Sequence, residues 1–156
     1  MDTRFATAIH LLVLVSSPHG RGLSAERMAR SVGTHPVRVR RILAALARAG
    51  LSETRRGRTG GTVLARPAEA ISLGDVYHAI YDDPELLPLH ADPDPRCPVG
   101  GAISLALLAP FAMAEATMVD ALRTTSIATV AASVAASVAT TRARRRLREE
   151  RASPVG

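Results

Sequence analysis

The sequence predicts a mostly α-helical protein that carries one two-stranded β-hairpin. Apolar residues make up 47% of the 156 positions and aromatic residues only 3%, so the core has to be built from Ala, Val, Leu and Ile, which favours helices. Several stretches repeat apolar residues with the period of a helix, and one glycine-rich segment separates two short extended runs. The shortage of aromatic rings argues against binding of single-stranded nucleic acid by base stacking.

Charge is distributed unevenly along the chain. Residues 1–66 hold 12 Arg and 3 acidic residues, a balance of +9, whereas residues 67–141 hold 2 Arg and 9 acidic residues, a balance of −7. Residues 142–156 return to +4, and the whole chain has a formal charge of +6. A basic first part before an acidic second part indicates a nucleic-acid-binding head joined to a body for partner binding or sensing.

Two helices are predicted at the start of the chain. An apolar stretch at residues 3–16 forms the first, and it ends before a segment that contains Ser, Pro and Gly. Ser24 is placed to cap a second helix over about 24–32. Gly33 then ends that helix.

A third helix follows, with either Thr34 or His35 as its N-cap and Pro36 in its first turn. Its apolar residues recur at i, i+3, i+4 and i+7 and form one buried stripe: Val39, Ile42, Leu43 and Leu46. The opposite face is rich in arginine: Val37, Arg38, Arg40, Arg41, Ala44 and Arg48. The sequence therefore predicts a helix with a cationic outer surface.

A β-hairpin and a fourth helix complete the first half. Two extended runs, 51–55 and 62–65, flank residues 56–61, which hold three Gly and two Arg. Ser72 caps a helix over about 72–82. A helix-turn-helix followed by a hairpin with a Gly/Arg tip is the winged helix-turn-helix pattern, in which a cationic helix enters the major groove of DNA.

The second half contains a long loop and two further helices. Residues 82–98 hold five Pro and five acidic residues, so they cannot form a regular element. Residues 101–123 are helical in pattern and apolar nearly all round, and a final helix of small residues covers about 126–140. The head alone is too small to cover the long helix, so we expect a second copy of the chain to bury it.

These patterns divide the chain into four parts. We expect a winged helix-turn-helix DNA-binding domain, a Pro-rich acidic linker loop, a helical dimerisation region with a long C-terminal dimerisation helix, and a basic, disordered tail. The predicted boundaries are 1–82, 83–98, 99–141 and 142–156.

The motifs in the head resemble the Rrf2 family of bacterial winged-helix regulators. The resemblance rests on SVGTHPVRVRRILAALARAGL at 31–51, RRGRTGG at 55–61, LARP at 64–67 and ISLGDVYHAI at 71–80, in that order. The family includes the IscR, NsrR and CymR types, and this chain is most similar to the cluster-free YwnA-like branch. The resemblance covers about residues 3–140 and implies a homodimeric transcription factor that acts on double-stranded DNA.

The candidate DNA-binding residues lie at the two helix starts, on the third helix and on the wing. We expect Arg38 and Arg41 to reach base edges, Arg48 to contact phosphate, and Arg56 or Arg58 to serve the wing. The full candidate set is Ser24, Thr34, His35, Val37, Arg38, Arg41, Arg48, Arg55, Arg56 and Arg58. For His35, a contact with DNA and a simple capping role both remain open.

Cys97 is the only cysteine, whereas the best-studied members of the family bind an iron–sulfur cluster through three. A cluster needs about four protein ligands, so we expect no cofactor and no metal. A mixed set of two Cys97 and two His10 in a dimer is the remaining alternative for binding a cluster.

Cys97 is also a candidate redox sensor. It precedes a helix start and adjoins Arg96, and both features would lower the pKa of its thiol. The alternative is that Cys97 is an inert residue.

Two long uncharged segments raise the question of membrane spans. Residues 97–114 and 124–141 are free of charge over 18 positions each, but Pro and Gly in the first and eight Ser or Thr in the second argue against membrane spans. With membrane spans argued against, we expect a cytoplasmic location. No catalytic constellation is present, so we expect a non-enzymatic regulator, a repressor of a palindromic operator. The alternatives are a repressor that responds to a small molecule, with no role for Cys97, and a protein-interaction module that has lost DNA binding.

Overall fold

The structure is a computed structural model that describes residues 2–18, 22–55, 61–81 and 87–152. The helices are α1 (Arg4–Ser16), α2 (Ala25–Val32), α3 (Pro36–Arg48), α4 (Leu73–Ile80), α5 (Gly100–Arg123) and α6 (Ile127–Ala152). The strands are β1 (Ser52–Arg55) and β2 (Gly61–Leu64), and a 3-10 helix, η2 (Ala68–Ala70), precedes α4. The predicted fold class, mostly α-helical with a two-stranded sheet, is confirmed.

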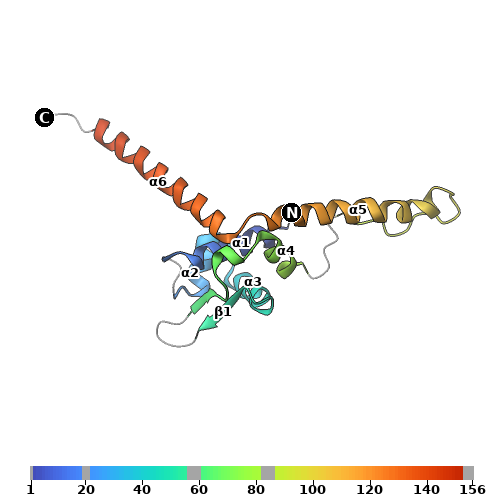
Figure 1. Cartoon of the computed structure of the whole chain (residues 1–156), viewed down its shortest axis with the longest axis horizontal. Coiled ribbons are helices and arrows are strands. Elements are labelled where there is room, and N and C mark those ends of the chain that lie inside the picture. Colours follow the sequence, from blue (N-terminus) through green and yellow to red (C-terminus); the bar gives the residue numbers. More distant parts are fainter. Residues whose placement is uncertain (1, 19–21, 56–60, 82–86, 153–156) are drawn as a thin grey trace.

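The elements from α1 to α4 form a head, and α5 and α6 project from it in different directions (Figure 1). Helix α1 is central, because it packs against α2, α3, α4, α6 and β2. The core contains apolar side chains from all these helices and from the segments that join them. Its fully buried members include Leu11, Leu12, Met28, Val39, Leu46, Leu51, Ile71, Val76 and Ile127.

Helices α2 and α3 form the helix-turn-helix, and local capping fixes the turn between them. The Ser24 hydroxyl accepts a hydrogen bond from the Arg27 N–H at 3.4 Å, as predicted for an N-cap. Gly33 adopts a left-handed conformation with φ of 72°, which a side chain would disfavour. The N-cap of α3 is His35, whose Nδ1 accepts from the Val37 N–H at 3.3 Å.

The wing is an antiparallel pair of strands in which Ser52 lies opposite Leu64 and Arg55 opposite Gly61. Its start is joined to α3, since the Leu51 N–H donates to the Leu46 carbonyl at 2.9 Å. The tip of the wing, residues 56–60, lies outside the described residues. Figure 1 shows the two strands at the edge of the head, next to α3.

Helix α4 begins with a capping box and is joined to the start of α6. The Ser72 hydroxyl accepts from the Asp75 N–H at 3.1 Å, and the Asp75 carboxylate accepts from the Ser72 N–H at 2.9 Å. The Ile127 N–H donates to the Ile71 carbonyl at 2.8 Å, and the Leu73 N–H donates to the Thr125 carbonyl at 2.9 Å. The turn between α5 and α6 is therefore held against the head.

Helices α5 and α6 expose most of their apolar surface in the single chain. Val119 is the one buried residue of α5, whereas Leu105 is 75% exposed and Met113 70% exposed. By length and composition alone, α5 is also the one helix in the described part of the chain that could span a membrane. The described residues 87–99, before α5, contain no helix or strand, as expected for the Pro-rich segment.

Two features differ from the sequence prediction. Helix α6 continues to Ala152, so the prediction of a disordered tail from Arg142 is wrong for residues 142–152. The physical reason is intrinsic propensity, because Arg, Leu, Glu and Ala are all strong helix formers and the run contains no Gly or Pro before residue 153. The 3-10 helix η2 was also absent from the prediction; its three residues lie directly after Pro67.

Candidate nucleic-acid interface

The outer face of α3 lies on the surface of the head, with its arginines exposed. Val39, Ile42 and Leu46 are buried and fix the opposite side of the helix against the core, as the apolar stripe predicted. Val37, in the first turn of α3, is 44% exposed. Arg38, Arg40, Arg41 and Arg48 are exposed as well.

The arginine face forms one wall of a concave surface of about 630 Å³, which we call the arginine concavity. Helix α3 contributes one wall, the start of α1 a second and the end of α4 a third. Four arginines line it and only one carboxylate, so its net charge is positive. Its lining residues are Asp2, Arg4, His35, Val37, Arg38, Arg41, Ala45, Arg48, Ala79 and Ile80.

Asp2 and Arg4 line the concavity although they are not among the residues predicted from sequence. The head's excess of arginine included Arg4, but only the packing of α1 against α3 brings the start of the chain beside the third helix. Sequence spacing offers no signal for this contact, because 34 positions separate Arg4 from Arg38.

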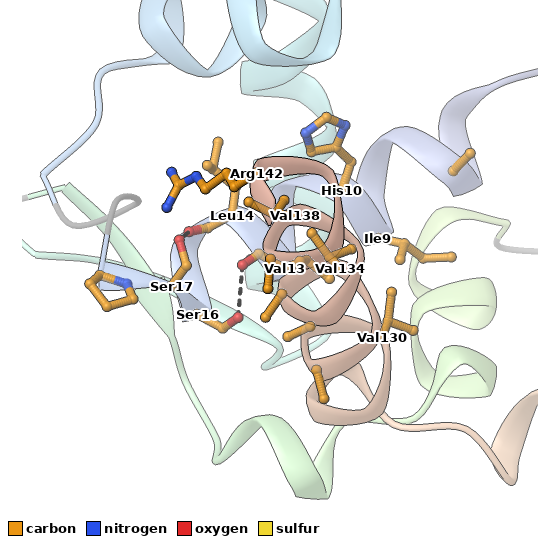
Figure 2. Close-up of a pocket in the computed structure, with 16 residues that line it drawn as sticks. Ile9, His10, Val13, Leu14, Ser16, Ser17, Val130, Val134, Val138 and Arg142 are labelled. Atoms are coloured by element: carbon orange, nitrogen blue, oxygen red, sulfur yellow. Dashed lines mark hydrogen bonds between the residues drawn. The ribbon is translucent and has the colours of Figure 1, made fainter. Parts of the chain in front are cut away.

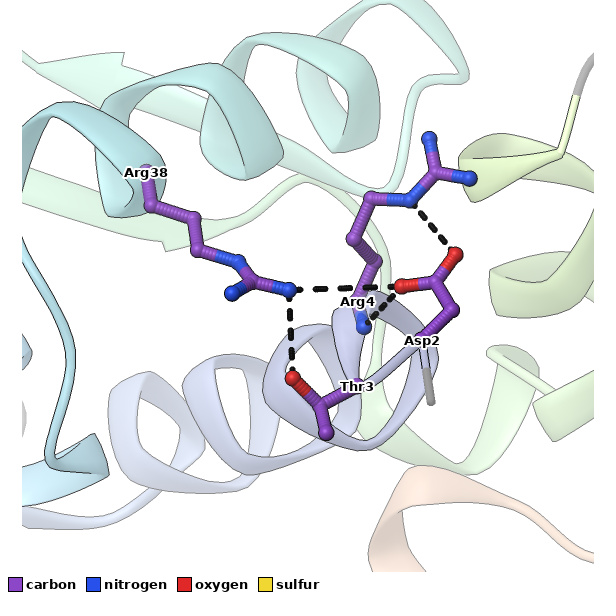
Figure 3. A network of polar contacts seen from close by, with 4 residues as sticks. All are labelled: Asp2, Thr3, Arg4 and Arg38. Carbon is purple, nitrogen blue, oxygen red and sulfur yellow. Dashed lines mark hydrogen bonds and ion pairs between the residues drawn. The ribbon is translucent and has the colours of Figure 1, made fainter.

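Asp2 joins Arg4 to Arg38 (Figure 3). Its Oδ2 lies 2.8 Å from the Arg4 Nε, and its Oδ1 accepts from the Arg4 backbone N–H at 2.9 Å. The Arg38 Nη2 donates to the Thr3 Oγ1 at 3.1 Å and lies 4.0 Å from the Asp2 Oδ1. The backbone N–H of Arg4, helped by its guanidinium, holds the pKa of the Asp2 carboxyl below its usual value, so the carboxylate is ionised at neutral pH.

Arg40 points to a different partner. It forms an ion pair with Glu26, which joins α3 to the first turn of α2. The pKa of the Glu26 carboxyl is lowered, first by the hydrogen bond from its own backbone N–H and next by the Ser24 hydroxyl. Both side chains are more than half exposed, so the pair is solvated and adds little to stability.

The remaining predicted residues lie at the helix turn and on the wing. The Thr34 N–H donates to the Ala29 carbonyl at 3.0 Å, and this residue is half-buried, whereas Ser24, which caps α2, is exposed. The Arg55 Nε pairs with the Glu53 Oε1 at 2.9 Å on β1. Arg56 and Arg58 lie outside the described residues. The structure therefore brings His35, Val37, Arg38, Arg41 and Arg48 together in one concavity.

Cys97 is exposed, three residues before α5. The backbone N–H of Gly100, followed by that of Val99, lowers the pKa of its thiol. His10 lies on α1, with its Nε2 3.3 Å from the Ser31 hydroxyl. Among the described residues no group of three or more His, Cys, Asp or Glu side chains could hold a metal ion within one chain.

An apolar groove of about 1030 Å³ runs between α1 and α6 (Figure 2). Ile9, Val13 and Leu14 face it from α1, and Val130, Val134 and Val138 from α6. The hydroxyls of Ser16 and Ser17 donate hydrogen bonds to backbone carbonyls of α1, so neither hydroxyl needs a partner in the groove. Arg142 of α6 and His10 of α1 also line the groove, and none of its lining residues is acidic (Figure 2).

The fold and the arginine concavity define a winged helix-turn-helix protein with a basic recognition helix. Residues 1–133 match the family described as "Rrf2: Iron-dependent Transcriptional regulator", so the chain belongs to the Rrf2 family of DNA-binding transcriptional regulators. The resemblance seen in the sequence motifs is thereby confirmed. The relatives are regulators and not enzymes, as expected.

Individual relatives agree with the family match. YwnA of Bacillus subtilis (strain 168), classed as an HTH-type transcriptional regulator, is 38% identical over 130 residues, which cover 83% of this chain and 96% of YwnA. A crystal structure of a protein classed as DNA-binding is 33% identical, covers 81% of this chain and 97% of its own, and has a TM-score of 0.64. CymR, the global cysteine regulator of B. subtilis, shares the fold at 19% identity and a TM-score of 0.61, over 85% of this chain and 95% of CymR.

Proposed function

We propose that this protein is a homodimeric repressor that binds a palindromic DNA operator through α3 and the wing of each head, in the cytoplasm. The observation that carries the proposal is the arginine concavity, where Arg38, Arg41 and Arg48 line one positively charged surface beside the exposed Val37. A cationic helix face of this kind fits the major groove, in which arginine binds guanine through two hydrogen bonds.

Binding to duplex DNA selected from a random library tests this proposal. Arg41→Ala should lose about 1–3 kcal/mol of binding free energy and relax specificity, if Arg41 binds a base edge through two hydrogen bonds. Arg48→Ala should weaken binding to all sequences and reduce the salt slope by about 1, as expected for a phosphate contact. Arg96→Ala, which removes the same charge from the loop before α5, is the matched control and should bind like wild type.

A protein-interaction module would give a different result. Its wild-type form would show no salt-dependent affinity for any duplex, and this outcome would reject the DNA-binding proposal. Equal binding by Arg41→Ala, Arg48→Ala and wild type would instead reject the arginine concavity as the DNA surface.

The homodimer is supported by two apolar surfaces that the single chain leaves uncovered. One is α5, whose residues 100–114 carry no charge, and the other is the groove between α1 and α6. In a two-fold dimer each chain can place its α5 over the groove of the other chain. The dimer then contains two identical contacts between α5 and the groove, and both apolar surfaces are buried. A small-molecule effector could fill the groove in place of the partner's α5. In that case α5 would stay uncovered.

A response to oxidants through Cys97 is the second part of the proposal. The exposed thiol has a lowered pKa, so a larger fraction is thiolate at neutral pH. Peroxide would transfer one oxygen atom to the thiolate sulfur and give a sulfenic acid and water after protonation. This added bulk at the start of α5 would change the spacing of the two heads, and operator half-sites tolerate little change in spacing.

Operator affinity with and without peroxide tests the redox response. Wild-type affinity should fall with peroxide and recover with a thiol reductant, whereas Cys97→Ser should be insensitive. A Cys97→Ser protein that responds like wild type would eliminate Cys97 as the sensor.

A further inference from the structure

We propose that Arg4 and Arg38 form a phosphate site, that the Asp2 carboxylate occupies this site in free protein, and that a backbone phosphate of DNA replaces it on binding. The inference rests on the proposed DNA-binding function and adds to it a second element, the start of α1. It makes Arg4 a DNA contact and Asp2 a competitor for that contact.

The geometry supplies two guanidinium groups around one anion (Figure 3). The Asp2 carboxylate lies 2.8 Å from the Arg4 Nε and 4.0 Å from the Arg38 Nη2. The two arginines come from different elements, the start of α1 and the first turn of α3, and converge on the same carboxylate. Two arginines that converge on one anion are a common arrangement for binding phosphate as well as carboxylate.

Arg4 also contacts Tyr81, which itself interacts with Asp2. Its guanidinium carbon lies 5.0 Å from the centre of the Tyr81 ring, within the range of a cation–π contact. Tyr81 in turn lies 5.0 Å from the Tyr77 ring, centre to centre, and Tyr77 is buried. The Arg4 guanidinium therefore keeps one protein contact, the Tyr81 ring, when the carboxylate leaves.

The site lies within the arginine concavity, on the route that a DNA backbone would take. Arg4, Arg38, Arg41 and Arg48 line the same surface. When a recognition helix enters the major groove, the sugar-phosphate backbone passes its ends, and Arg38 lies in the first turn of α3. A phosphate there would meet both Arg38 and Arg4, so the proposal gives Arg38 a phosphate contact in place of the base-edge contact expected from the sequence.

Exchange of the carboxylate for a phosphate is physically reasonable. The side chains of Arg4, Arg38 and Asp2 are 50%, 45% and 40% exposed, so the existing ion pairs are solvated and weak. A diester phosphate carries the same single negative charge and also accepts hydrogen bonds from arginine. Asp2 thus keeps the two arginines paired in free protein and reduces their attraction for nonspecific DNA.

Removal of the Asp2 charge tests the proposal directly. Asp2→Asn should raise affinity for operator DNA about two- to five-fold, the range expected when an exposed ion pair no longer competes. Arg4→Ala should weaken binding and reduce the salt slope by about 1, because one phosphate contact is lost. All proteins should carry any affinity tag at the C-terminus, so that the first residues stay unmodified.

Asp120→Asn is the matched control. It removes the same charge from an exposed ion pair with Arg123, at 2.9 Å, in the last turns of α5 and outside the concavity. Any gain in this variant reports the general effect of net charge, and the gain in Asp2→Asn should exceed it. In an Arg4→Ala background the gain from Asp2→Asn should shrink, since one of the two arginines that Asp2 occupies is missing.

Each outcome has a distinct meaning. An Asp2→Asn affinity equal to or below that of Asp120→Asn overturns the competition, and an Arg4→Ala protein with wild-type affinity and salt slope overturns the phosphate site. A wild-type protein that binds no DNA would reject the proposed function itself. Equal thermal unfolding temperatures for the variants and wild type show that the comparison concerns binding and not folding.

Discussion

Tyr77 is the residue at which the head makes a polar contact with α5. Its hydroxyl lies 3.5 Å from the Glu115 Oε1, and its ring lies edge-on to Phe5 with 5.6 Å between centres. Burial raises the pKa of the Tyr77 phenol, and the charge of Glu115 adds to the effect. Burial also raises the pKa of Tyr81, with Asp2 next in importance.

These two shifts predict how the protein responds to alkaline pH. A tyrosine whose pKa is raised by folding stabilises the folded state fully below its unfolded pKa of about 10, and this contribution disappears as pH rises through the folded pKa. The chain has only two tyrosines and no tryptophan, so tyrosinate absorbance follows both directly. We expect both midpoints above 10 and a free energy of unfolding that falls as pH rises beyond that value.

The Tyr77→Phe variant assigns the two midpoints, because only Tyr81 then titrates. The same titration in denaturant supplies the unfolded reference. Midpoints at or below the denatured value would show that neither phenol is protected by the head.

Residues that cap helices were predictable from sequence, and those that meet across the fold were not. Ser24 and Ser72 were identified because a hydroxyl before an apolar-periodic run satisfies the first N–H groups of a helix. The choice of His35 and not Thr34 as the N-cap of α3 depends on the backbone conformation, since both side chains can accept a hydrogen bond. The contact of Asp2 with Arg38 depends on tertiary packing and left no local signal.

At the scale of elements, the start of α4 joins the head to the projecting helices. Ser72 caps α4, and its backbone forms an isolated β-bridge with Ser126, just before α6. Loss of the cap should therefore loosen both α4 and the turn between α5 and α6. Ser72→Ala should lower the free energy of unfolding by about 1 kcal/mol, the usual cost of losing a serine N-cap.

Urea unfolding measures this cost, with Ser133→Ala as the control. The Ser133 hydroxyl is exposed on α6 and donates to the Thr129 carbonyl of its own helix at 3.1 Å, so its loss should change stability little. Equal midpoints for Ser72→Ala and Ser133→Ala would show that the capping box adds nothing to stability.

Elements with strong periodicity were predicted within a few residues, whereas α6 was predicted too short. The density of charge after Arg142 favours a solvated, disordered tail. The same residues are good helix formers, and α6 continues through them to Ala152. The density of charge therefore favours a disordered tail and helix propensity favours a continued helix, and the structure follows helix propensity.

At the scale of the whole molecule, α5 is the feature that a single chain leaves unexplained. Its residues Leu105, Leu108 and Met113 are 75%, 54% and 70% exposed, in a helix that is apolar on nearly every side. A helix of this kind is stable in water only when another surface covers it. The sequence predicts that a second copy of the chain covers this surface, and in the proposed dimer the apolar groove between α1 and α6 of the partner would receive it.

The Leu108→Arg variant tests the dimer. A dimer interface would have to bury the new guanidinium without a partner, and an unpaired buried charge is strongly unfavourable, so the variant should be a monomer or an aggregate. Leu108→Met keeps the size and apolar character of the side chain and should remain a dimer. Sedimentation velocity at micromolar concentration distinguishes these species. A wild-type protein that is a well-behaved monomer in water would contradict the dimer, and one that sediments with lipid vesicles would indicate that a membrane, and not a second copy, covers α5.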